Sequence, residues 1–205
     1  MLDQLTEWIV RIVESLGYTG VAFLVTLENV FPPIPSELVL ALAGFVASRG
    51  QATLLGMIAA ATVGSVVGAW LLYGVAYAFG PAPLHALVRR FGRWVRITER
   101  DLDTAERWFA RWSTMAVLLC RFVPLVRSLI SVPAGFERMN FASFTLYTAI
   151  GSLIWNAIFV SAGFLLGERW ELVLHYADYF QLVAGIAMAA LGLWALVWLI
   201  RRRTA

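Results

Sequence analysis

The chain consists of long apolar stretches separated by short polar segments. Three of the apolar stretches are uninterrupted, and two are broken by proline. Continuous apolar runs occupy residues 52–79, 141–166 and 178–200. A helix of about 20 apolar residues is long enough to cross the hydrocarbon core of a bilayer. The pattern therefore predicts an all-α integral membrane protein with three transmembrane helices at these positions.

Two other apolar stretches, residues 17–48 and 114–136, are broken in the middle by proline. The first contains Phe-Pro-Pro-Ile-Pro after Val30, and the second contains Pro124. Proline removes a backbone donor and clashes with the preceding helical turn, so each stretch should bend sharply there. Each half has only about 10 to 13 residues, which is too short to cross a bilayer alone. We therefore predict two re-entrant helical hairpins.

The remaining segments are polar and amphipathic. Residues 1–16 carry three acids and lack the basic start and small-residue cleavage site of a signal peptide, so we expect an interfacial helix of the mature protein. Residues 81–112 contain seven arginines and predict one or two interfacial helices. Arginine blocks beside apolar spans mark the cytoplasmic side, and Arg201–Arg203 end the chain in the same way. The C-terminus is therefore predicted to be cytoplasmic.

Composition agrees with a single membrane domain over residues 1–205. Hydrophobic residues make up 60% of the chain and charged residues only 14%. The net charge of +3 does not indicate nucleic-acid binding, because the arginines are concentrated beside the predicted spans.

The two broken stretches also resemble each other. Residues 31–45 align without a gap on residues 122–136, and both segments end in Ala-Gly-Phe. Each is followed by a predicted transmembrane helix, which indicates an internal repeat. The arginine bias then requires one hairpin to enter from the external face and the other from the cytoplasmic face. The predicted architecture is an inverted repeat of two opposed re-entrant hairpins, as in secondary transporters.

Four ionisable residues lie in the broken stretches: Glu28, Glu37, Arg121 and Arg127. A charge at the bilayer centre costs roughly 2.5–3.5 kcal/mol on insertion scales. Two buried ion pairs that fasten the hairpins are the structural alternative, although such pairs stabilise poorly compared with apolar packing. We favour a functional site, with acids from one hairpin meeting arginines from the other.

The motifs in the two broken stretches resemble those of a known family. Glu28-Asn-x-Phe-Pro-Pro-Ile-Pro-Ser-Glu37 and Arg121-Phe-Val-Pro-x-x-Arg127, followed by Pro133-Ala-Gly135, are similar to the signatures of the DedA family of membrane proteins. The resemblance covers roughly residues 18–170. It implies lipid transport in a bacterial plasma membrane, with undecaprenyl phosphate and phosphatidylethanolamine as the substrates known in the family, and dependence on the proton gradient. It also implies that the acidic pair and the arginine pair are the functional residues.

The expected mechanism combines the resemblance with the chemistry of these residues. Arg121 and Arg127 would bind a lipid phosphate, because guanidinium offers paired donors to phosphate oxygens. Ser36 would cap the second half of the first hairpin or donate to the phosphate directly. Glu28 and Glu37 would compete for the arginines and carry the coupling proton. The sequence indicates three possible lining residues, which are Asn29, Asn156 and Ser128.

Other function classes remain as alternatives. The chain could carry phosphatidylethanolamine or phospholipids in general, or could hydrolyse a lipid phosphate. A phosphatase would need a nucleophile or a carboxylate–metal cluster, and the sequence predicts no metal site, no cofactor and no enzymatic activity. A channel would need a continuous polar path, which residues 178–200 do not offer beyond their first turn. The expected partners are the lipid phosphate, protons and the bilayer, whereas the oligomeric state is undetermined.

Overall fold

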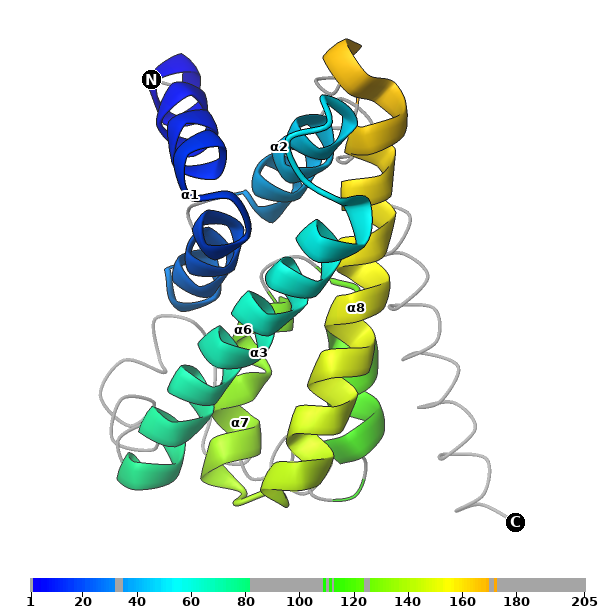
Figure 1. Cartoon of the computed structure of the whole chain (residues 1–205). Coiled ribbons are helices and arrows are strands. Elements are labelled where there is room, and N and C mark those ends of the chain that lie inside the picture. Colours follow the sequence, from blue (N-terminus) through cyan, green and yellow to red (C-terminus); the bar gives the residue numbers. More distant parts are fainter. Residues whose placement is uncertain are drawn as a thin grey trace.

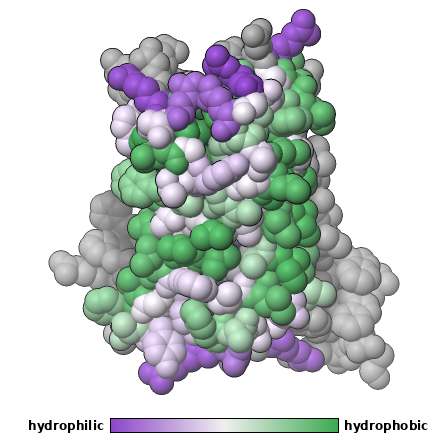
Figure 2. Space-filling model, viewed as in Figure 1, coloured by the Kyte–Doolittle hydropathy of each residue, from purple (hydrophilic) through white to green (hydrophobic). Residues whose placement is uncertain are grey.

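The computed structural model describes residues 2–31, 35–81, 113–123 and 126–169, together with residues 109, 111 and 172. Helices are the only regular secondary structure among these described residues. Three of their helices are long and apolar enough to cross a membrane: Trp8–Val30, Leu54–Phe79 and Phe141–Leu166. Hydrophobic residues form a band around the middle of the visible face, and hydrophilic residues gather at its two ends (Figure 2). The protein is therefore an all-α, multi-pass membrane protein.

The predicted third span, 178–200, lies outside the described residues, as do nearly all the arginine-rich residues of 81–112. Their helices stay predictions.

Helix α1 (Leu2–Val30) has a kink at Gly17, whose φ of 55° and ψ of −125° are not helical. A positive φ favours glycine because glycine has no Cβ. The kink lies at the boundary between the predicted interfacial segment and the first arm of the first hairpin. By length and composition, however, Trp8–Val30 is also long and apolar enough to span a membrane.

The chain resumes as α2 (Ser36–Ser48), which packs against α1 and, more extensively, against α8 (Phe141–Leu166). Ser36 is not the N-cap, so the first of its two predicted roles was wrong, and its direct contact with phosphate stays a prediction. Pro35 occupies the N-cap position in an extended conformation and makes no side-chain cap hydrogen bond. Proline can hold this position because its ring keeps φ near the observed −67°. Ser36 is thus the first helical residue.

The second broken stretch begins as a helix over residues 113–120 and then turns at Arg121–Val123. Two short helices follow, α6 (Val126–Leu129) and α7 (Ser131–Phe136). The predicted interruption beside Pro124 is therefore present in the fold.

The two long helices α3 (Leu54–Phe79) and α8 share the same construction. Both have 26 residues, and they run in opposite directions (Figure 1). The side chains of Thr53 and Asn140 cap their N-termini by accepting a backbone N–H three residues later. Gly80 and Gly167 end them with φ of 65° and 51°. Adding 87 to a residue number in α3 therefore gives the corresponding residue in α8, from the N-terminal cap to the C-terminal cap.

Each broken segment also packs closely against a long helix through a glycine. Gly44 of α2 lies against α8, where a Cβ would overlap the carbonyl of Val160 and the amide four residues later. Gly135 of α7 lies against α3, where a Cβ would overlap the carbonyl of Tyr73 and again crowd the amide four residues later. Each broken segment thus packs on the long helix of the other half with the same local geometry. This arrangement brings the two helix breaks together inside the bundle.

Candidate functional site

All four ionisable residues that the sequence singles out are buried. Their exposed fractions are 3% for Glu28, 5% for Glu37, 2% for Arg121 and 5% for Arg127. Four uncompensated charges at the centre of a bilayer would cost about 10 kcal/mol. This cost is comparable with the whole stability of a typical domain, which is about 5–15 kcal/mol. The surroundings of each group must therefore offset its burial.

Glu28 and Arg127 form an ion pair across the two halves. Arg127 Nη2 in α6 donates a hydrogen bond to Glu28 Oε1 near the end of α1. The Arg127 guanidinium also lies over the ring of Trp155 on α8, 5.6 Å from its centroid. Glu28 Oε2 is buried and finds no hydrogen-bond partner within the described part of the chain. The pair is thus electrostatically matched but retains one unused acceptor.

Arg121 occupies a different environment. Its Nη2 donates to Ser131 Oγ and Thr148 Oγ1, both at 3.2 Å. Its Nε is buried and has no partner among the described groups. Thr148, which binds Arg121, and Trp155, which contacts Arg127, are seven residues apart on α8, or about 10 Å along the helix axis. The two arginines therefore contact α8 at different heights.

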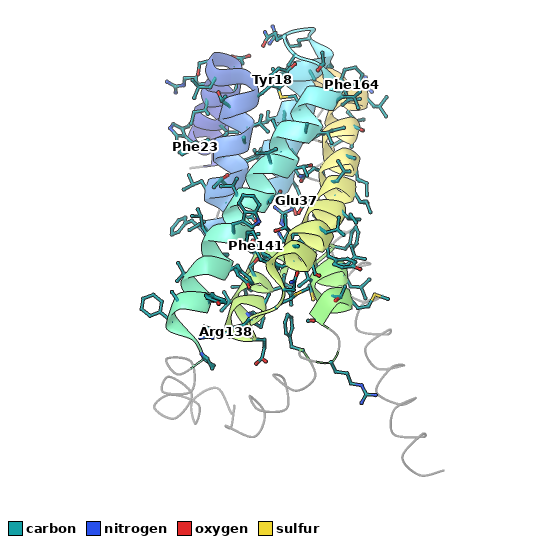
Figure 3. The ribbon with its side chains drawn as sticks, turned by 60° about the horizontal axis from the view of Figure 1, so that its bottom comes forward. Tyr18, Phe23, Glu37, Arg138, Phe141 and Phe164 are labelled. Carbon is teal, nitrogen blue, oxygen red and sulfur yellow. The ribbon has the colours of Figure 1, made fainter. Side chains whose placement is uncertain are left out.

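Glu37 lies in the first turn of α2, near the centre of the bundle (Figure 3). In that view it lies between one end marked by Tyr18 and Phe164 and the other marked by Arg138. A carboxylate in the first turn is favoured by the helix dipole, which offsets part of its burial. Ser36 beside it is also buried, with 7% exposure.

The three predicted lining residues are buried in the same interior. Asn29 follows Glu28 and donates to the carbonyl of Val25 at 2.9 Å. Ser128 follows Arg127, and its hydroxyl lies 3.5 Å from Asn29 Oδ1. The first broken segment therefore meets the second along two successive residues on each side.

Asn156 lies on α8 and bridges to α3. Its Nδ2 lies 3.3 Å from both Thr62 Oγ1 and Ser65 Oγ. Its other amide atom, Oδ1, is buried and has no partner among the residues that the structure describes. Three of these hydroxyl residues, Thr148, Ser131 and Ser65, were not predicted from the sequence as part of the site. Thr148 lies eight residues before Asn156, and this spacing on one helix face is the signal that would have found it.

The described residues contain no group of three histidine, cysteine or acidic side chains that could hold a metal ion. The groups that are present are guanidinium, carboxylate, hydroxyl and amide. Paired guanidinium donors suit phosphate oxygens, and carboxylates compete with phosphate for the same donors. The arrangement is therefore suited to the reversible binding of an anion.

Comparison with known proteins places the chain in a family. A family model described as the VTT domain matches residues 34–165. The "Alkaline phosphatase-like protein" of Lactococcus lactis subsp. cremoris is 40% identical over 198 residues, which cover 96% of this chain and 92% of the relative. No solved structure matches the chain.

Two further relatives carry the name "Undecaprenyl phosphate transporter A". The protein of Staphylococcus aureus is 34% identical over 170 residues, covering 83% of this chain and 82% of the relative. The protein of Bacillus subtilis is 30% identical over 205 residues, covering 100% of this chain and 96% of the relative. Because the VTT model spans more than half of the sequence, the chain belongs to the VTT-domain family, the DedA family whose motifs its two broken segments resemble.

Proposed function

We propose that this protein is a lipid transporter of the bacterial plasma membrane that translocates undecaprenyl phosphate. One observation carries this proposal: the Glu28–Arg127 ion pair is buried where the two broken segments meet inside an apolar helix bundle. Apolar packing would hold the segments together at lower cost than a buried ion pair. Ionisable groups inside membrane domains generally mark the path of a substrate, an ion or a proton. The names of the Staphylococcus and Bacillus relatives support a polyprenyl phosphate as the substrate.

The two broken segments act as re-entrant hairpins of an inverted repeat. The matching caps of α3 and α8 and the reciprocal packing of Gly44 and Gly135 support this reading. The first hairpin enters from the external face and the second from the cytoplasmic face, with the C-terminus in the cytoplasm. Transporters with inverted repeats commonly bind their substrate where two broken helices meet near the bilayer midplane.

The phosphate binds to the guanidinium groups of Arg121 and Arg127, while the prenyl chain stays in the bilayer. Arg121 Nε has no acceptor among the described residues, and a phosphate oxygen is a suitable acceptor for it. Arg127 is occupied by Glu28 and becomes available only when that ion pair opens. Substrate and Glu28 therefore compete for one cation.

A proton controls this competition. Protonation of Glu28 removes its negative charge, weakens the ion pair and frees Arg127 for the phosphate. Loss of the proton restores the pair and displaces the phosphate. Glu37 is the second acid of the cycle. We assign the switching proton to Glu28 first, because Glu28 is the acid that pairs with Arg127.

Reconstituted vesicles test this proposal. Arg127→Ala should abolish the translocation of undecaprenyl phosphate, because the variant lacks the guanidinium that alternates between Glu28 and phosphate. Arg49→Ala is the matched control, since it also removes an arginine but from an exposed pair with Glu14. The control should transport like the unmodified protein. Transport at the unmodified rate by a folded Arg127→Ala protein would refute the assignment of Arg127 to the phosphate site.

Hydrolysis of a lipid phosphate is the second candidate, because the Lactococcus relative is named "Alkaline phosphatase-like protein". The same vesicles distinguish the two functions. A phosphatase releases inorganic phosphate from undecaprenyl phosphate, whereas a transporter moves the intact lipid between leaflets. Vesicles with labelled phosphatidylethanolamine in place of the prenyl lipid determine whether general phospholipid transport is the better description.

A further inference from the structure

Helix α8 carries a row of buried polar side chains, Thr148, Ser152 and Asn156. They are spaced four residues apart and therefore lie on one face of the helix. Their exposed fractions are 0%, 4% and 0%. One end of the row binds Arg121 through Thr148. The other end lies beside Trp155, whose ring is covered by the Arg127 guanidinium. The row thus runs between the two arginines.

The fold does not require these polar side chains. The offset of 87 residues that aligns α3 with α8 matches Thr148 with Ala61 and Asn156 with Ala69. Both alanines are fully buried, with 0% exposure. The corresponding position for Ser152 is Ser65, which the row contacts through Asn156. Alanine therefore fills these positions in the other half, and the polar groups of α8 have a role other than packing.

Three buried polar atoms at this row or at its two ends have no partner in the described part of the protein: Arg121 Nε, Asn156 Oδ1 and Glu28 Oε2. Buried polar groups in native proteins nearly always have a partner, from protein, water or ligand. Turning the Asn156 amide over does not help, because its outer atom then becomes an amide nitrogen that also lacks a partner. Water can pair with all three atoms, because it both donates and accepts hydrogen bonds.

We propose that Thr148, Ser152 and Asn156 form a hydrated track inside the bundle, along which the phosphate headgroup passes between Arg121 and Arg127. The second part of this statement rests on the proposed function, whereas the hydration does not. Arg121 and Arg127 then act as two successive phosphate sites rather than as one clamp, because the residues that they contact on α8 lie about 10 Å apart along the helix axis. Hydroxyl and amide groups along α8, with their bound waters, solvate the phosphate between these sites.

Cysteine labelling tests the hydration directly. In a Cys120→Ser background, which removes the chain's single cysteine, single cysteines are placed along α8. The row variants are Thr148→Cys, Ser152→Cys and Asn156→Cys. The controls, on the outer surface of the same helix, are Ile150→Cys, Ile154→Cys and Ile158→Cys. A charged thiosulfonate reagent reacts with the thiolate and so requires water, and we expect row positions to react at least about tenfold faster than the controls.

A short-chain polyprenyl monophosphate should protect the three row positions and leave the controls unchanged. Equal labelling of both faces, or no labelling of the row, overturns the hydrated track even if the unmodified protein transports lipid. Labelling of the row by a protein that moves no lipid phosphate would instead refute the proposed function and leave the track in place. Labelling without protection overturns the passage of the headgroup along it.

A transport measurement completes the test. Ser152→Val removes a hydroxyl from the row, and Ser161→Val makes the same change nine residues later, on the opposite face of α8. Ser152→Val should lower the maximal transport rate about tenfold, as expected for one lost hydrogen bond to a charged group, with little change in the substrate concentration at half-maximal rate. Ser161→Val should leave both unchanged. Asn156→Ala, which matches the alanine of α3, should show the same loss of rate while its thermal unfolding stays close to that of the unmodified protein. Unchanged rates in both row variants would refute the track.

Discussion

The Glu28–Arg127 ion pair offers the sharpest test of how the two halves are held together. Both side chains are almost fully buried, and they form a salt bridge with each other. Glu28→Leu leaves a buried guanidinium without its carboxylate, and Arg127→Met leaves a buried carboxylate without its cation. Removal of one partner from a buried pair typically costs about 3–5 kcal/mol. We expect each single variant to lose this much of its free energy of unfolding.

The double variant should behave differently. Replacement of a whole buried ion pair by apolar residues of similar size is often neutral or stabilising. Glu28→Leu with Arg127→Met should therefore unfold with a free energy closer to that of the unmodified protein than either single variant. The assay is equilibrium unfolding in mixed detergent micelles, monitored by the loss of helical circular dichroism. The double variant should nevertheless be inactive in lipid phosphate transport, which separates stability from function.

The exposed pair of Glu14 and Arg49 provides the control cycle. These side chains are 38% and 54% exposed, and their closest charged atoms lie 3.7 Å apart. Exposed pairs contribute about 0–1 kcal/mol, so each single change there should alter the free energy of unfolding by no more than this. If the losses at Glu28 and Arg127 simply add in the double variant, the two side chains are not coupled and the reasoning about the buried pair fails.

Two further predictions concern the packing and the caps. Gly44→Ala should destabilise the protein strongly, because its Cβ would overlap the backbone carbonyl of Val160, whereas Gly74→Ala has open space and should gain about 0.5–1 kcal/mol from its higher helix propensity. Thermal unfolding in detergent compares the two, and equal melting temperatures would contradict the close packing of α2 on α8. Asn140→Ala should cost about 1 kcal/mol, because it removes the side-chain acceptor for the backbone N–H of Ser143. A melting temperature equal to that of the unmodified protein would show that this cap contributes nothing.

Much of the fold could be predicted from local patterns. The spans 52–79 and 141–166 lie within about two residues of α3 and α8, because long apolar runs and capping residues act within one helix. The interruption beside Pro124 was predictable for the same reason. The prediction of Ser36 as an N-cap was wrong, because serine and proline compete for one cap position and the sequence alone does not show which residue takes it.

The candidate residues could be selected from the sequence because charges inside apolar stretches are costly wherever the chain folds. Their partners could not be read in this way. Arg127 pairs with an acid 99 positions away, while Arg121 binds the hydroxyls of Ser131 and Thr148. These contacts depend on the depth at which each broken segment sits against the long helices.

The sequence by itself determined where helices form, where they break and which charges must be buried, because those properties follow from hydrophobicity, proline geometry and the cost of desolvation. Only the tertiary structure decided that the arginines contact α8 at two heights and that a polar row lies between them. The positions of the broken segments along the long helices depend on two close contacts, Gly44 against α8 and Gly135 against α3. Such contacts set the relative heights of segments far apart in the chain, and no local pattern encodes them.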